Sequence, residues 1–184
     1  MARGDHAAMM IKRLLSLGAA LAALVGCGGD GPSTVPGLRS PATWSSFVYA
    51  TNEGPLLLEV QGNPFGTGKA ELGESISRAL VAGIPARPFS LTTDPATAPR
   101  PNFRVVVVLG APKSLDERAI CAGKAKIADG KLDGDRLDVI ATFCDGESPL
   151  SSVRGWVAKL DGGQDRRLAL LFNQVARDLM GEAG

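Results

Sequence analysis

The chain has one histidine, no long basic run and no apolar run of transmembrane length. Each of these absences excludes a class of protein. The histidine is His6, so the rest of the chain lacks the imidazole needed by Ser-His-Asp or Cys-His catalysis and by histidine-ligated metal sites. Lysine and arginine (20) nearly balance aspartate and glutamate (19) without forming a basic run, which predicts no nucleic acid among the partners. No internal repeat is visible.

A signal-peptide pattern occupies residues 1–26. Lys12 and Arg13 form a positive segment, and Leu14–Val25 then form an apolar segment of twelve residues. This layout is typical of secretory signal peptides, and the apolar segment is shorter than the roughly 20 residues of a transmembrane helix. A true start at Met9 or Met10 gives the more ordinary signal peptide.

The pattern ends in Leu24-Val25-Gly26-Cys27, which resembles the lipobox of bacterial lipoproteins at all four positions. The resemblance implies cleavage before Cys27, a diacylglycerol on its thiol and a further fatty acid, such as palmitate, on the new amino group. It also implies that the lipid bilayer is a partner. Gly28 stands where Asp favours inner-membrane retention in such lipoproteins, so we expect an outer-membrane anchor that faces the periplasm.

Cys121 and Cys144 remain once Cys27 is acylated. Exported proteins usually pair their cysteines, and neither thiol has a histidine to activate it or a Cys-x-x-Cys spacing. The sequence therefore predicts a structural disulfide between Cys121 and Cys144, with a redox or nucleophilic thiol as the alternative.

The composition changes along the mature chain. Residues 27–45 are rich in Gly, Pro, Ser and Thr, which predicts a lipidated flexible tether. Residues 46–184 carry the apolar patterns of a single α/β (α+β) domain. We expect a two-layer sandwich, with a sheet of four to five strands covered by two amphipathic helices.

Period-2 and period-3.6 patterns place these elements. The expected strands are 46–51 and 55–62, joined as a hairpin, then a central strand 103–109, a strand 136–144 and an edge strand 151–159. The expected helices are 68–82 and 165–180. The second carries a continuous apolar stripe from Leu168 to Leu179 and can be capped by Asp161 or Asp165.

The stretch "EVQGNPFGTGKAELG" (59–73) imitates a phosphate-binding loop but lacks its chemistry. Asn63 replaces the first glycine, and Ala70 follows Lys69 where a hydroxyl should ligate magnesium. The sequence predicts an ordinary connection from strand to helix. The aspartates of 128–138 likewise lack calcium-loop spacing, so no metal and no cofactor are expected.

No residue pattern predicts a catalytic site. The main hypothesis is a non-catalytic binding or accessory module of an envelope system, which binds an unknown envelope protein or ligand. The alternative is a histidine-free hydrolase that uses two carboxylates on an envelope polymer; Glu59 and Glu74 are candidates without special spacing. The cluster of Trp44, Phe47 and Tyr49 is expected either to pack in the core or to form an aromatic contact patch.

Overall fold

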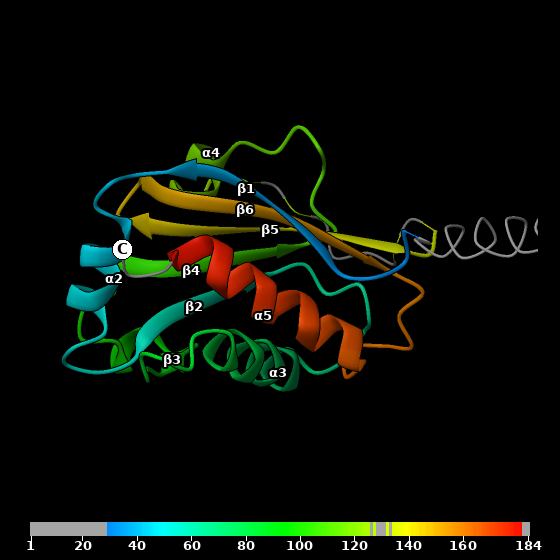
Figure 1. The fold of residues 1–184 in the computed structure, drawn as a ribbon, viewed down its shortest axis with the longest axis horizontal. Helices are drawn as coiled ribbons and strands as arrows, with labels where there is room; N and C mark the ends of the chain where they lie inside the picture. Colours follow the sequence, from blue (N-terminus) through cyan, green and yellow to red (C-terminus); the bar gives the residue numbers. More distant parts are fainter. Residues whose placement is uncertain (1–28, 126, 128–131, 133, 182–184) are drawn as a thin grey trace, which may run out of the picture.

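A computed structural model describes residues 29–125, 127, 132 and 134–181. They form one mixed six-stranded sheet and four α-helices, arranged as shown in Figure 1. The elements are β1 (Ser33–Arg39), α2 (Thr43–Ala50), β2 (Leu56–Gln61), α3 (Lys69–Ala82), β3 (Leu91–Thr92), η2 (Pro95–Thr97), β4 (Phe103–Leu109), α4 (Glu117–Cys121), β5 (Arg136–Asp145), β6 (Ser148–Ala158) and α5 (Arg166–Met180). The mixed α/β class predicted from the sequence is confirmed, but the sheet has six strands where four to five were expected.

The strand order is β1-β6-β5-β4-β2-β3. β2 runs parallel to β3 and β4, and the remaining neighbours are antiparallel. β4 is central, as predicted, because its run of four valines is buried on both faces.

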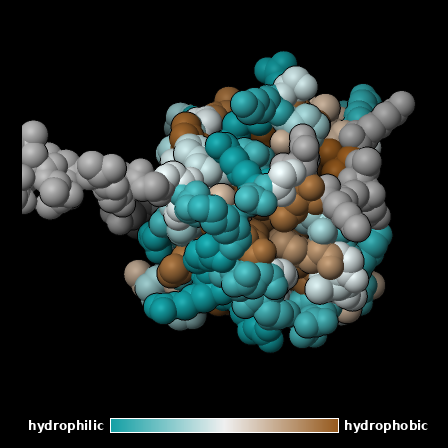
Figure 2. Space-filling model, turned by 90° about the vertical axis from the view of Figure 1, so that its right-hand side faces the viewer, coloured by the Kyte–Doolittle hydropathy of each residue, from teal (hydrophilic) through white to brown (hydrophobic). Residues whose placement is uncertain are grey.

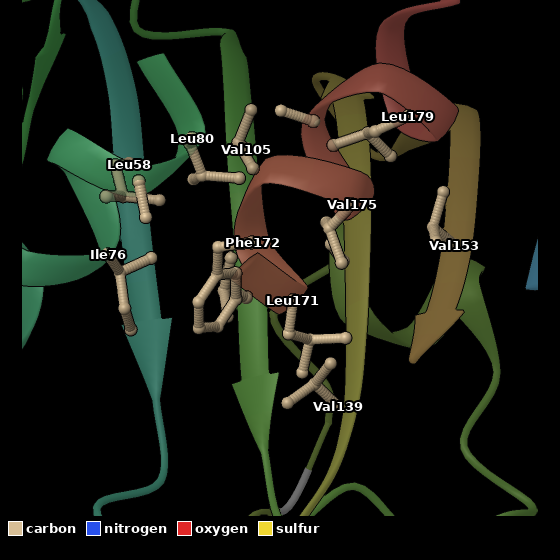
Figure 3. Close-up of a cluster of buried hydrophobic side chains, with 14 of the residues drawn as sticks. Leu58, Ile76, Leu80, Val105, Val139, Val153, Leu171, Phe172, Val175 and Leu179 are labelled. Carbon is tan, nitrogen blue, oxygen red and sulfur yellow. The ribbon is translucent and has the colours of Figure 1, made fainter. Parts of the chain in front are cut away.

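The two long helices cover one face of the sheet (Figure 1). α5 lays its apolar stripe over the sheet, and α3 packs beside it through Leu72, Ile76 and Leu80. Figure 3 shows Leu171, Phe172 and Val175 of α5 directed at the strands that carry Val105 and Val139. Both predicted helices are confirmed, and Asp165 caps α5 by accepting a hydrogen bond from the Arg167 N–H.

The opposite face carries a smaller apolar cluster under α4. Val106, Val108 and Ile140 pack there against Ile120 and the Cys121–Cys144 disulfide. The disulfide confirms the predicted pairing, and both cysteines are buried. α4 and its flanking segments therefore add a partial third layer to the expected two.

The predicted strand 46–51, and with it the hairpin to 55–62, is wrong. These residues belong to α2, whose buried residues Thr43, Phe47 and Ala50 recur at spacings of four and three. The aromatic and β-branched run Phe47-Val48-Tyr49 favours a strand locally, but a helix buries Phe47 fully and leaves Tyr49 in solvent. β2 instead pairs with β3 and β4.

The predicted tether 27–45 is also wrong over most of its length. β1 pairs antiparallel with β6, and α2 begins at Thr43. Because β1 covers β6, the predicted edge strand 151–159 lies inside the sheet. The sequence did not predict β1 because Val35–Arg39 are all exposed, so the strand has no alternation of apolar and polar residues.

β1 carries an irregularity that weakens its pairing. The register shifts between Pro36 and Arg39, and the Leu38 N–H donates to the Ser152 hydroxyl at 3.0 Å instead of to a backbone carbonyl. A Cβ at Gly37 would lie 2.4 Å from the same Ser152 oxygen, so any larger residue there would displace the hydroxyl that accepts from Leu38. Bulges and prolines are common devices that keep an edge strand from pairing with another chain.

Candidate functional site

The two ends of the sheet differ in what they expose. β1, α3 and α5 all begin at one end, which we call the Ser33 end; it lies on the right in Figure 1. α2 and the last turns of α3 and α5 lie at the other end, which we call the α2 end. Among the described residues no helix is long and apolar enough to cross a membrane.

An apolar pocket of about 470 Å³ opens at the α2 end. It is lined by residues from α2, from the segment after α3 and from the end of α5: Trp44, Gly83, Ile84, Pro85, Ala86, Arg87, Arg177 and Gly181. Among the described residues, the only charged ones in this lining are the two arginines. The pocket therefore suits an apolar or aromatic group that lies beside a negative charge.

Close helix packing fixes the floor of this pocket. A Cβ at Gly83 would lie 2.6 Å from the backbone oxygen of Asn173 and 2.8 Å from Ala176 Cβ, so only glycine lets the end of α3 approach α5 this closely. The Asn173 side chain donates to the Ala79 carbonyl at 2.7 Å and joins the same two helices. Pro85 then prevents α3 from continuing, and the chain turns outward to form the wall.

Aromatic packing fixes the other wall. Phe47 is fully buried, and its ring centroid lies 5.6 Å from that of Trp44 and 5.0 Å from that of Phe89. The Arg87 guanidinium lies 5.3 Å from the Phe47 ring centroid and donates to the Val48 carbonyl at 3.1 Å. The rim charge of Arg87 is thus held in place before any ligand arrives.

A second exposed aromatic residue lies on the far side of α2. Tyr49 is 53% exposed, and the Arg100 guanidinium stacks 3.9 Å from its ring centroid. Arg100 also pairs with Glu53 at 2.6 Å and donates to the Tyr49 carbonyl. The cluster predicted from the sequence thus divides: Phe47 belongs to the core, whereas Trp44 and Tyr49 present aromatic surface on the two flanks of α2.

The loop that imitates a phosphate site lies at the opposite, Ser33 end. It connects β2 to α3 as predicted, and Gly62 has a φ of 80°, with its Cα close to the Leu109 carbonyl. The Asn63 amide donates to the Thr67 carbonyl at 2.7 Å and closes the loop on itself. A pocket of about 310 Å³ beside it includes Ala125 and Ile127, next to residues that the structure does not describe, and part of the aspartate-rich stretch 128–138 also lies outside the described residues.

The candidate carboxylates of the hydrolase hypothesis are not arranged as a pair. Glu59 on β2 forms an ion pair with Arg104 at 3.2 Å on the face that carries α4, and Glu74 is exposed on α3 on the other face. Within the described residues, no group of three or more His, Cys, Asp or Glu side chains is placed to hold a metal ion. Arg167 and the N–H groups of Asp161 and Arg167 hold the pKa of Asp165 well below its usual range, but they do so by capping α5.

Of the site residues predicted from the sequence, Cys121 and Cys144 are joined on the buried side of α4, which indicates a structural role. Cys27 lies outside the described residues. Sequence reasoning missed the pocket at the α2 end, because its residues come from three separated segments. In the sequence, Gly83-Ile84-Pro85 indicates only the end of a helix and gives no indication of a binding surface.

No family model matches the chain, and no curated protein matches it either. Among solved structures, two PelC dodecamers from Paraburkholderia phytofirmans, one of them a single-residue variant, are similar at 13% sequence identity. They cover 83% and 82% of this chain and 99% of their own, with TM-scores of 0.46 for the variant and 0.43 for the other.

Proposed function

We propose that the protein is an exported lipoprotein, held in the outer membrane by acyl chains on Cys27, that binds a partner in the periplasm without catalysis. The lipobox Leu24-Val25-Gly26-Cys27 supports the anchor. Two or three acyl chains give stable attachment, since each buried CH₂ contributes about 0.8 kcal/mol. The Cys121–Cys144 disulfide suits an oxidising compartment.

The pocket at the α2 end is the observation that carries the binding function. It combines an apolar floor with the rim cations Arg87 and Arg177, and no carboxylate of the described residues lines it. Buried aromatic and apolar anchors flanked by charge are typical of the few interface residues that dominate binding energy. The occupant that fits is a partner segment with an apolar or aromatic side chain beside an Asp or Glu.

Site-specific photo-crosslinking in cells tests this function. A photoreactive amino acid replaces Pro85 at the exposed edge of the pocket of the full-length chain, and the adducts are identified after purification from the envelope. We expect a discrete adduct that Arg177→Glu weakens at least about tenfold, because losing one rim contact and adding a repulsive charge costs over 1.4 kcal/mol. Ala86→Glu should block the pocket in the same way.

Ala169→Glu is the matched control, because Ala169 is an equally exposed alanine on α5 away from the pocket. This variant should leave the adduct unchanged. Adducts that form equally from position 169, or that survive both pocket variants, would show that the pocket is not the binding site. A Cys27→Ala protein that still carries fatty acid and sediments with membranes would refute the anchor.

A further inference from the structure

The chain is attached to the folded domain almost immediately after the proposed lipid. The Asp30 carbonyl accepts a hydrogen bond from the Ala158 N–H at 3.1 Å, and its carboxylate pairs with Lys159 at 2.5 Å. β1 begins at Ser33, opposite Trp156 of β6. The polypeptide is therefore bound to the Ser33 end of the sheet from Asp30 onward.

This attachment limits the distance from the bilayer. Cys27 precedes Asp30 by three residues, so their Cα atoms are at most about 11 Å apart. A diacylglycerol on Cys27 holds that residue at the headgroup layer. The Ser33 end must then lie within roughly one helix diameter of the lipid surface, and from Asp30 onward the chain does not act as the expected flexible tether.

β1 exposes an apolar side chain close to this attachment point. Val35 is 51% exposed, which makes it one of the four exposed large apolar residues found within the described ranges. Val35 lies opposite Arg154 and Ser33 opposite Trp156, so Val35 lies on the α4 face of the sheet together with those two side chains. α4 covers that face toward the α2 end, where Cys121 is bonded to Cys144, and leaves this corner open.

Cations surround the apolar corner. The Arg136 guanidinium lies 4.7 Å from the Trp156 ring centroid, and Lys113, Arg136 and Arg154 line a groove with Val35 and Trp156. Two carboxylates pair with two of these cations: Asp138 with Arg136 at 2.7 Å and Glu117 with Arg154 at 3.9 Å. Figure 2, which views the molecule from the Ser33 end, shows apolar surface exposed between hydrophilic side chains.

We propose that this corner, the β1 patch of Val35 and Trp156 with Lys113, Arg136 and Arg154, rests on the headgroup layer of the anchoring bilayer. The proposal rests on the proposed acylation of Cys27. Apolar and indole groups with a surplus of Lys and Arg match the chemistry of an anionic membrane interface. The pocket at the α2 end then faces the periplasm, because β6 spans about 35 Å from Ser148 to Ala158.

The two tryptophans of the chain mark the two ends and give the test. Trp156 lies in the β1 patch and Trp44 in the pocket. Acylated protein is reconstituted in vesicles that contain anionic phospholipid and brominated acyl chains, which quench nearby indoles. In Trp44→Phe the remaining Trp156 should be quenched, whereas in Trp156→Phe the remaining Trp44 should keep its full intensity.

Surface variants separate the patch from the anchor. Val35→Glu should abolish the quenching of Trp156 while the protein still floats with the vesicles. Leu170→Glu, which changes an exposed apolar residue on α5, should leave the quenching unchanged. Mass spectrometry and flotation check the acyl anchor independently, so protein that lacks lipid and fails to float refutes the proposed function as well as the orientation.

Two other outcomes overturn the orientation alone. In the first, the protein is acylated and floats, but Trp156 is no more quenched than Trp44. In the second, Trp156 stays unquenched and the protein forms dimers that Val35→Glu dissociates. The second result would assign the β1 patch to a contact between two copies of the chain.

Discussion

Replacing both Cys121 and Cys144 by alanine should destabilise the domain by about 3.5 kcal/mol, because the disulfide closes a loop with a sequence separation of 23 residues. The bond joins α4 to β5 and holds α4 on Val106, Val108 and Ile140. Without it, α4 has only five residues and a small apolar cluster to keep it in place. A helix this short has little stability of its own.

Urea unfolding followed by circular dichroism measures this loss. For a domain of this size the loss corresponds to a fall in Tm of about 7–14 °C. Hydrogen exchange should show that amides of α4 lose protection first, while those of α5 keep it. Reductant should lower the stability of the wild type and leave the double variant unchanged. A double variant within about 1 kcal/mol of the wild type, or one equally sensitive to reductant, would refute a stabilising crosslink.

Three further predictions test separate parts of the fold. The folded-state pKa of Asp165 is depressed, so its carboxylate contributes stability that is present above its unfolded pKa of about 3.9 and is lost as pH falls further. Asp165→Asn should therefore lose less stability than the wild type in acid unfolding. Asp165→Ala should lower the free energy of unfolding by about 1–2 kcal/mol at pH 7, because it removes the cap of α5. Thr142 is buried and its hydroxyl has no partner among the described residues, so Thr142→Val should raise the free energy of unfolding by about 1 kcal/mol, measured by thermal unfolding. Thr43→Val removes a hydroxyl that donates to the Leu150 carbonyl, so it should lower the stability in the same assay. A chain that starts at Ser40 lacks β1 and exposes the edge of β6, so it should aggregate or unfold on gel filtration; a stable monomer would contradict this role of β1.

Elements whose buried positions follow from the apolar pattern of their own segment could be predicted. α5 repeats apolar residues at helical spacing from Leu168 to Leu179, and β4 has four consecutive valines, so each pattern has one physical solution. The disulfide followed from compartment and cysteine number alone. In each case the determining information lies within a single segment or in a simple count.

Elements whose burial depends on distant segments could not be predicted. α2 has eight residues and contains a strand-favouring run, so contacts with Phe89 and the core decided its conformation. β1 is a strand because β6 offers it an edge, and its own Ser, Thr, Pro and Gly residues resemble a linker. The pocket at the α2 end is harder still, since it exists only where residues 44, 83–87, 177 and 181 converge.

The correction at β1 changes what the N-terminal segment does. A tether of nineteen residues, 27–45, would let the domain rotate freely, so no surface would be assigned to the membrane. Under the proposed acylation of Cys27, the chain is bound to the sheet at Asp30, three positions after the lipid, and the sheet would take a fixed direction relative to the bilayer. The contact between Asp30 and Lys159 would then help to set which end of the molecule faces a periplasmic partner. Breaking it with Lys159→Ala should loosen the orientation of an acylated protein before it affects folding, because an exposed ion pair contributes under about 1 kcal/mol to stability. The measurement is a lower quenching of Trp156 by brominated lipid with an unchanged unfolding midpoint, and quenching equal to the wild type would show that the patch alone sets the orientation.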